Sequence, residues 1–214
     1  YSKQDHWDVF KNLFFQKISE YKSMESLRSN GLSNMLETGL PSEDLEETLK
    51  GKIYSTEYDS HEIEDIKKRF DQLIEMMGDE LSEIPFNSLV GRPRHYKQNY
   101  ENKIFNLNFD DLYHVYSSWQ IKRILNAIDQ TPPTNILEIG AGYGNLAFKL
   151  KSIFKYSRYI IIDLPEVLLL QHHYLYMCNP DFKIINLLDH SSGNNIDIDT
   201  LDFDIILIPF TIFK

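Results

Sequence analysis

The stretch that decides the fold is ILEIGAGYGN, which runs from Ile136 to Asn145. An apolar run carries the acidic Glu138 near its end, and glycines follow at alternate positions, Gly140, Gly142 and Gly144. A helical pattern of apolar residues begins directly after them. Strand, glycine turn and helix in this order build a site where the backbone closely approaches a nucleoside-type cofactor.

A second apolar strand, RYIIID, ends in Asp163 about twenty residues after the glycine turn, where nucleotide-binding folds place a ribose ligand. Asp163 can also cap the helix that begins at Pro165, and the two roles are compatible. A tight turn without any ligand is the alternative for the glycines. Three glycines, two flanking acids and the strand context make that alternative the weaker interpretation.

Strands and helices alternate from Asn135 onward. We expect strands at 136–139, 159–163, 182–187 and 204–208, with helices after Gly144 and from Pro165 to about Met177. Continuous apolar runs such as YIII and IILI are typical of strands buried on both faces of a parallel sheet, and right-handed crossovers would place helices on both faces. The sequence predicts an α/β fold: a Rossmann-like doubly wound sheet, represented by its first half, strands one to four.

The chain ends soon after the fourth strand, which would leave an apolar, unpaired edge. It also begins without a methionine. We therefore expect a fragment of a longer protein, cut at both ends.

The residues before the sheet are predicted to be helical. Trp7, Phe10, Phe14 and Ile18 share one helical face. Further helices are expected at 42–50, at 60–77 with Asp59 or Ser60 as the cap, and at 112–128, while 85–108 is expected to be an extended loop. These patterns predict a helical cap or lid region at 1–130, and a cofactor-binding domain at 131–214.

Composition limits the possible partners. The net charge of −10 makes a nucleic-acid partner improbable, and no apolar run approaches the ~20 residues that span a bilayer. The single cysteine, Cys178, is typical of a reducing cytoplasm. Arg92, Arg94, His95 and Lys97 form a basic cluster, for which a solvated loop is favoured over a clamp for an anionic group.

Two residues indicate which cofactor the glycine turn accepts. Asn145 occupies the position where a dinucleotide fingerprint has glycine or alanine. A carboxylate at Glu138 is unfavourable beside a pyrophosphate and favourable beside a cation. S-adenosylmethionine carries a sulfonium and an ammonium and has no phosphate.

The sequence EIGAGYG resembles the first motif of class I S-adenosylmethionine-dependent methyltransferases. Together, LEIGAGYGNLA and IIDLPEVLLLQHHYL resemble bacterial sugar O-methyltransferases, most closely from Asn135 to about Tyr176. The resemblance implies that Glu138 holds the methionine end of the cofactor and that Asp163 accepts both ribose hydroxyls. It further implies that Leu164 packs against the adenine and that Asp189 contacts the adenine amino group. The backbone would approach the cofactor closely at Gly140, Ala141, Gly142 and Gly144. Pro209 and Phe210 would border the methyl group.

The expected function is S-adenosylmethionine-dependent O-methylation of a sugar or glycan-precursor hydroxyl. Such a hydroxyl needs a general base or a metal. No residue pattern makes a metal site, no histidine is assigned as the base, and a base is expected beyond Lys214. The alternatives are a non-catalytic Rossmann-like binding or scaffold module and a nicotinamide-dependent oxidoreductase. The oligomeric state and the position methylated stay open.

Overall fold

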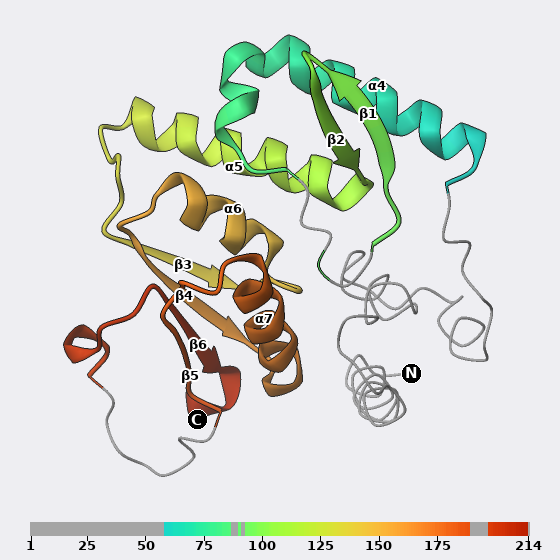
Figure 1. Cartoon of the computed structure of the whole chain (residues 1–214). Helices are drawn as coiled ribbons and strands as arrows, with labels where there is room; N and C mark the ends of the chain where they lie inside the picture. Colours follow the sequence, from blue (N-terminus) through green and yellow to red (C-terminus); the bar gives the residue numbers. More distant parts are fainter. Residues whose placement is uncertain (1–57, 87–89, 91–92, 189–196, 214) are drawn as a thin grey trace, which may run out of the picture. The chain divides into compact units, whose positions relative to one another are not determined.

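The computed structural model describes residues 58–86, 90, 93–188 and 197–213, which are coloured by sequence in Figure 1. The helices expected around 7–18 and at 42–50 lie outside the described residues, as does Asp189. The described residues divide into two compact units, one made of those before Lys68 and between 90 and 108, the other of 68–86 with 109–213. The predicted division near residue 130 stays a prediction.

The first unit contains a β-hairpin where the sequence predicted a loop. Strand β1 (Tyr96–Tyr100) pairs antiparallel with β2 (Lys103–Leu107). The connecting residues, Glu101 and Asn102, have φ of +46° and +63°. Two successive left-handed residues are typical of a two-residue hairpin turn whose twist matches the strands. The loop prediction was wrong because apolar and polar residues alternate only weakly in this polar segment, so neither the strands nor the turn could be recognised.

Helix α4 (Ser60–Met77) confirms the expected helix at these residues. The Asp59 side chain accepts a hydrogen bond from Glu62 N at 2.8 Å, and the Glu62 side chain accepts one from Asp59 N at 3.0 Å. This reciprocal pair is a capping box, with Asp59 as the cap. The boundary between the two units falls within α4. The short helix η2 (Gly78–Glu83) follows α4 in the chain.

The second unit contains a parallel four-stranded sheet, so the predicted α/β fold class is confirmed. Its helices and strands can be followed in Figure 1. In chain order they are α5 (Phe109–Ala127), β3 (Asn135–Ile139), α6 (Asn145–Ile153), β4 (Arg158–Asp163), α7 (Pro165–Cys178), β5 (Ile184–Asn186), η3 (Ile198–Thr200), β6 (Ile205–Pro209) and η4 (Phe210–Phe213). These bounds agree with the predicted elements, except that β5 is shorter and α5 begins earlier.

The sheet order is β3-β4-β6-β5, which places the strand before the glycine turn at an edge. In a doubly wound sheet of order 3-2-1-4 that strand would be internal. The burial pattern agrees with the observed order. Tyr159 and Ile161 of β4, and Ile205 and Leu207 of β6, are fully buried, whereas Leu137 and Ile139 of β3 are 59% and 73% exposed. The two central strands thus carry fully buried side chains, and the edge strand β3 carries none.

Both faces of the central strands are packed. On one face, α7 reaches the end of β4, and α6 lies beside α7 through a hydrogen bond from Tyr174 Oη to Asn145 Oδ1 at 3.1 Å. On the other face, Ile206 and Ile208 cluster with Ile198 and Leu201 from the segment before β6. In the described part of the chain, that second face is thus packed by this segment and not by an α-helix.

Candidate functional site

The glycine turn lies between the carboxyl end of β3 and the first residue of α6. Gly140 has φ +74°, and its N–H donates to Ile162 O at 3.0 Å, which ties the turn to the end of β4. A Cβ at Gly140 would meet no described atom within 4 Å, so space is open beside the backbone there. At Gly144, with φ +99°, a Cβ would lie 3.3 Å from Leu175 Cγ. The first glycine therefore leaves room for a ligand, and the last allows α6 to pack against α7.

Glu138 is a half-buried carboxylate on β3, two residues before Gly140. Its Oε2 accepts a hydrogen bond from Tyr159 Oη at 2.8 Å. Burial raises the pKa of Glu138 above its usual range, and the Tyr159 hydroxyl and the nearby His114 only partly oppose that rise. The charged form of Glu138 is therefore poorly compensated by the protein itself.

Asp163 lies beside the glycine turn because β3 and β4 are adjacent and parallel. Its Oδ1 accepts from Leu164 N at 2.7 Å, its Oδ2 accepts from Gln171 Nε2 at 2.7 Å, and the Ala141 N–H also donates to it. Burial raises the pKa of Asp163, and these three donors offset only part of the effect. A carboxylate has about four acceptor positions. The protein uses three, which leaves about one for a ligand hydroxyl.

A buried polar cluster supports the start of α6. Asn145 is 2% exposed, and its Nδ2 donates to Asp110 Oδ2 at 3.1 Å and to Asp111 Oδ1 at 3.4 Å, both on α5. Asp110 also accepts from Tyr143 Oη, and its Oδ1 lies 3.2 Å from His114 Nδ1. Burial raises the pKa of Asp110, but these hydrogen bonds outweigh it and bring the pKa below its usual value. The asparagine that departs from a dinucleotide fingerprint thus joins α5 to α6.

The remaining predicted positions lie around this edge of the sheet. Leu164 is half-buried and occupies the N-cap position of α7, where no side-chain hydrogen bond caps the helix; the expected cap, Asp163, precedes it. Pro209 pairs in register with Asp163, and β4 separates it from Glu138, while Phe210 is 62% exposed. Sequence reasoning missed Gln171, Tyr159 and the aspartates of α5. The signal was weak, because only the helical spacing from Pro165 could have placed Gln171 near Asp163.

The other candidate groups have structural partners or no shared site. Arg94 of the basic cluster pairs with Glu62 at 3.1 Å and stacks on Tyr58. Lys97 lies on strand β1 and not in the expected solvated loop, and Arg92 is outside the described residues. Within the described residues, no three histidine, cysteine, aspartate or glutamate side chains gather as metal ligands. No helix in the described part combines the length and apolar character that crossing a membrane requires.

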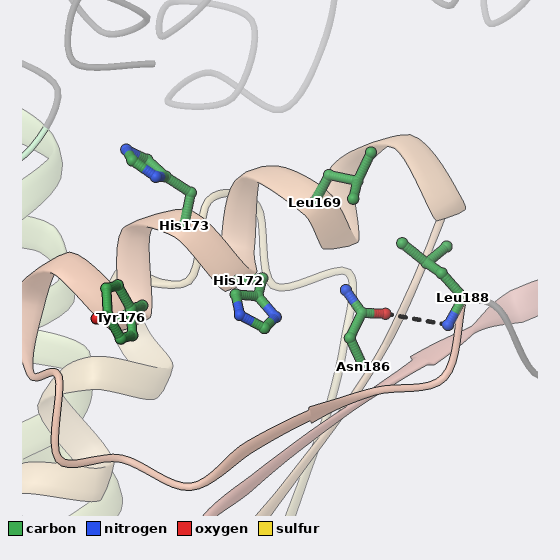
Figure 2. Close-up of a pocket in the computed structure, with 6 residues that line it drawn as sticks. All are labelled: Leu169, His172, His173, Tyr176, Asn186 and Leu188. Carbon is green, nitrogen blue, oxygen red and sulfur yellow. Dashed lines mark hydrogen bonds between the residues drawn. The ribbon is translucent and has the colours of Figure 1, made fainter. Parts of the chain in front are cut away.

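A pocket of about 480 Å³ lies between α7 and the end of β5 (Figure 2). It is lined by Leu169, His172, His173, Tyr176, Asn186 and Leu188. Within it, the Asn186 side chain accepts a hydrogen bond from Leu188 N at 3.1 Å, as the close-up shows. Among the described residues, none of the predicted cofactor-binding positions lines this pocket.

A glycine turn at the carboxyl end of a parallel sheet, with an acid after the neighbouring strand, is the architecture of Rossmann-like cofactor-binding proteins. The sequence profile of an O-methyltransferase domain matches residues 70–186, more than half of the chain. The chain therefore belongs to this O-methyltransferase family, whose members normally use S-adenosylmethionine. No curated protein and no solved structure gives a significant match.

Proposed function

We propose that this chain binds S-adenosylmethionine at the glycine turn and methylates a sugar or glycan-precursor hydroxyl. Glu138 would hold the methionine end, and Asp163 would accept a ribose hydroxyl. Backbone at Gly140, Ala141, Gly142 and Gly144 would lie against the cofactor, with Leu164 against the adenine. Asp189, outside the described residues, is proposed to read the adenine amino group.

The observation that carries the proposal is the pair of poorly compensated carboxylates beside an open glycine. Burial raises the pKa of both Glu138 and Asp163, and in the described part of the chain neither pairs with a lysine or arginine. An uncompensated buried carboxylate is stabilised by a cation or by hydroxyl donors. A ligand with a positively charged end and a ribose supplies both, whereas a pyrophosphate would add negative charge next to Glu138.

The chemistry of the proposed reaction is an in-line displacement at carbon. When bound, S-adenosylmethionine supplies the electrophilic methyl group. The chain contributes binding and alignment, with the carboxylates fixing the two ends of the cofactor and the glycine turn admitting it close to the backbone. The acceptor hydroxyl must lose a proton, and no described residue is assigned that role. A sugar acceptor and a cytoplasmic location are parts of the proposal that rest on resemblance and on cysteine content.

The test is transfer of radiolabelled methyl from S-adenosylmethionine to acceptors of different classes. Monosaccharides and nucleotide sugars would be compared with a catechol, which represents phenolic acceptors. Label in the sugars that is lost in Asp163→Asn and retained in Asp181→Asn, an exposed matched control, would support the proposal. Label only in the catechol would contradict the sugar assignment. Cofactor binding without transfer to any acceptor would favour the non-catalytic alternative.

A further inference from the structure

Gln171 joins the two halves of the candidate site from a third element. It lies on α7, and its side chain is fully buried. The side-chain nitrogen donates to Gly142 O at 2.8 Å and to Asp163 Oδ2 at 2.7 Å. One amide therefore links the carbonyl of the glycine turn to the carboxylate that ends β4.

The orientation of this amide follows from its neighbours. Gly142 O and Asp163 Oδ2 can only accept, so the amide nitrogen must face them. The oxygen, Gln171 Oε1, is then left without a hydrogen-bond partner among the described residues. A buried acceptor without a donor is unfavourable, and a leucine of similar size would avoid it. At this position, glutamine therefore makes two hydrogen bonds through its nitrogen and leaves its oxygen unsatisfied.

Two nearby acidic residues disfavour the charged form of Asp163, which the hydrogen bond from Gln171 favours. Glu166, in the first turn of α7, raises the pKa of Asp163 further. Across the strands, Asp163 in turn raises the pKa of Glu138, which is hydrogen-bonded to Tyr159 and near His114. With acids on both sides, the Gln171 donor is one of three that hold this carboxylate in place.

Resting on the proposed function, we propose that Gln171 is a positioning residue for S-adenosylmethionine: it fixes Asp163 against the glycine turn in the arrangement that receives the ribose. Gln171 acts through Asp163 and does not itself contact the reacting atoms. Removal of the side-chain amide would leave Asp163 with two donors and free the glycine turn from β4 on this side.

The test is titration of S-adenosylhomocysteine into wild type, Gln171→Leu and Gln171→Glu between pH 5 and 8.5. Gln120→Glu, a half-exposed glutamine on α5, is the control for the charge change. At pH 8 we expect affinity to fall about tenfold to hundredfold in Gln171→Leu, the range for one hydrogen bond to a charged group. The control should stay within twofold of wild type.

The direction of the pH dependence separates positioning from general loss of structure. Wild-type affinity should fall on acidification, because Asp163 becomes protonated. In Gln171→Glu, two carboxylates face each other at high pH, and one added proton restores a donor between them. Its affinity should therefore rise as the pH falls from 8.5 toward 6. Without ligand, the urea midpoint of Gln171→Glu should rise relative to that of wild type as the pH falls from 8.5 toward 6.

Three results would decide the matter. The expected loss in Gln171→Leu together with the reversed profile in Gln171→Glu supports the positioning role. Wild-type binding that is lost in Asp163→Asn but unchanged within twofold in Gln171→Leu overturns this inference and leaves the proposed function intact. A folded wild type that does not bind S-adenosylhomocysteine overturns the proposed function, and the positioning role with it.

Discussion

Replacement of Gly144 by alanine tests the geometry at the start of α6. Gly144 is the residue before α6 and has φ +99° and ψ 15°, outside the left-handed region that alanine tolerates best. An added Cβ would lie 3.3 Å from Cγ of Leu175, which is fully buried on α7. Both the backbone and the packing therefore oppose the substitution.

The expected loss of stability is the sum of these two effects. A residue held in a sparsely populated backbone region costs about 1–3 kcal/mol. An extra methyl group in a well-packed core costs about 1–3 kcal/mol more. We therefore expect Gly144→Ala to lower the free energy of unfolding by about 2–6 kcal/mol.

Gly78→Ala is the matched control, because Gly78 has φ +55° and a Cβ there would meet nothing within 4 Å. It should lose only about 1 kcal/mol, the usual difference for alanine in the left-handed region. Urea unfolding monitored by circular dichroism measures both variants. Equal losses at the two glycines would refute the argument that α6 packs tightly against α7 at Gly144.

Three further predictions concern the buried polar groups. Asn145→Leu should lower the free energy of unfolding by about 2–4 kcal/mol, because Asp110 and Asp111 of α5 each lose one hydrogen-bond donor and Tyr174 Oη loses its acceptor; urea unfolding measures this. Lys149→Met should cost about 3–5 kcal/mol in the same assay, since Asp111, 2.7 Å from Lys149 Nζ, loses its cation in the core; adding Asp111→Asn should recover part of the loss. For Glu138, burial raises the folded-state pKa, so its stabilising contribution is present below the unfolded pKa and lost as pH rises through the folded pKa. The urea midpoint of Glu138→Gln should therefore exceed that of wild type at pH 8 and approach it near pH 4.5; a gap that widens on acidification would contradict this.

The parts of the fold that could be predicted from sequence are those with strong periodicity. The apolar runs of β4 and β6 and the amphipathic stripe of α4 each indicate one type of element. The hairpin around Glu101 and Asn102 could not be predicted, because its strands are polar and its turn depends on two non-glycine residues with positive φ. The edge position of β3 was also hidden, since strand order is set by contacts between segments far apart in sequence.

The candidate site likewise contains residues that could be predicted from the sequence and residues that could not. Glu138, the glycines and Asp163 belong to one local pattern, and parallel pairing of β3 with β4 brings that pattern together. Gln171 lies eight residues after Asp163 and reaches it only because α7 turns back over the end of β4. The asparagine after the glycine turn was interpreted as a departure from a dinucleotide motif. Its partners on α5 give the physical reason, and those partners are more than thirty residues away.

The most direct test of the central claim is calorimetric titration of the folded protein with S-adenosylhomocysteine, with NAD as the control ligand. The account predicts micromolar binding, about −8 kcal/mol, that is lost in Asp163→Asn and retained in Asp181→Asn. It predicts no binding of NAD, because the pyrophosphate would lie beside Glu138. Binding of NAD with no response to S-adenosylhomocysteine would contradict the account, and so would equal S-adenosylhomocysteine affinity in wild type and Asp163→Asn.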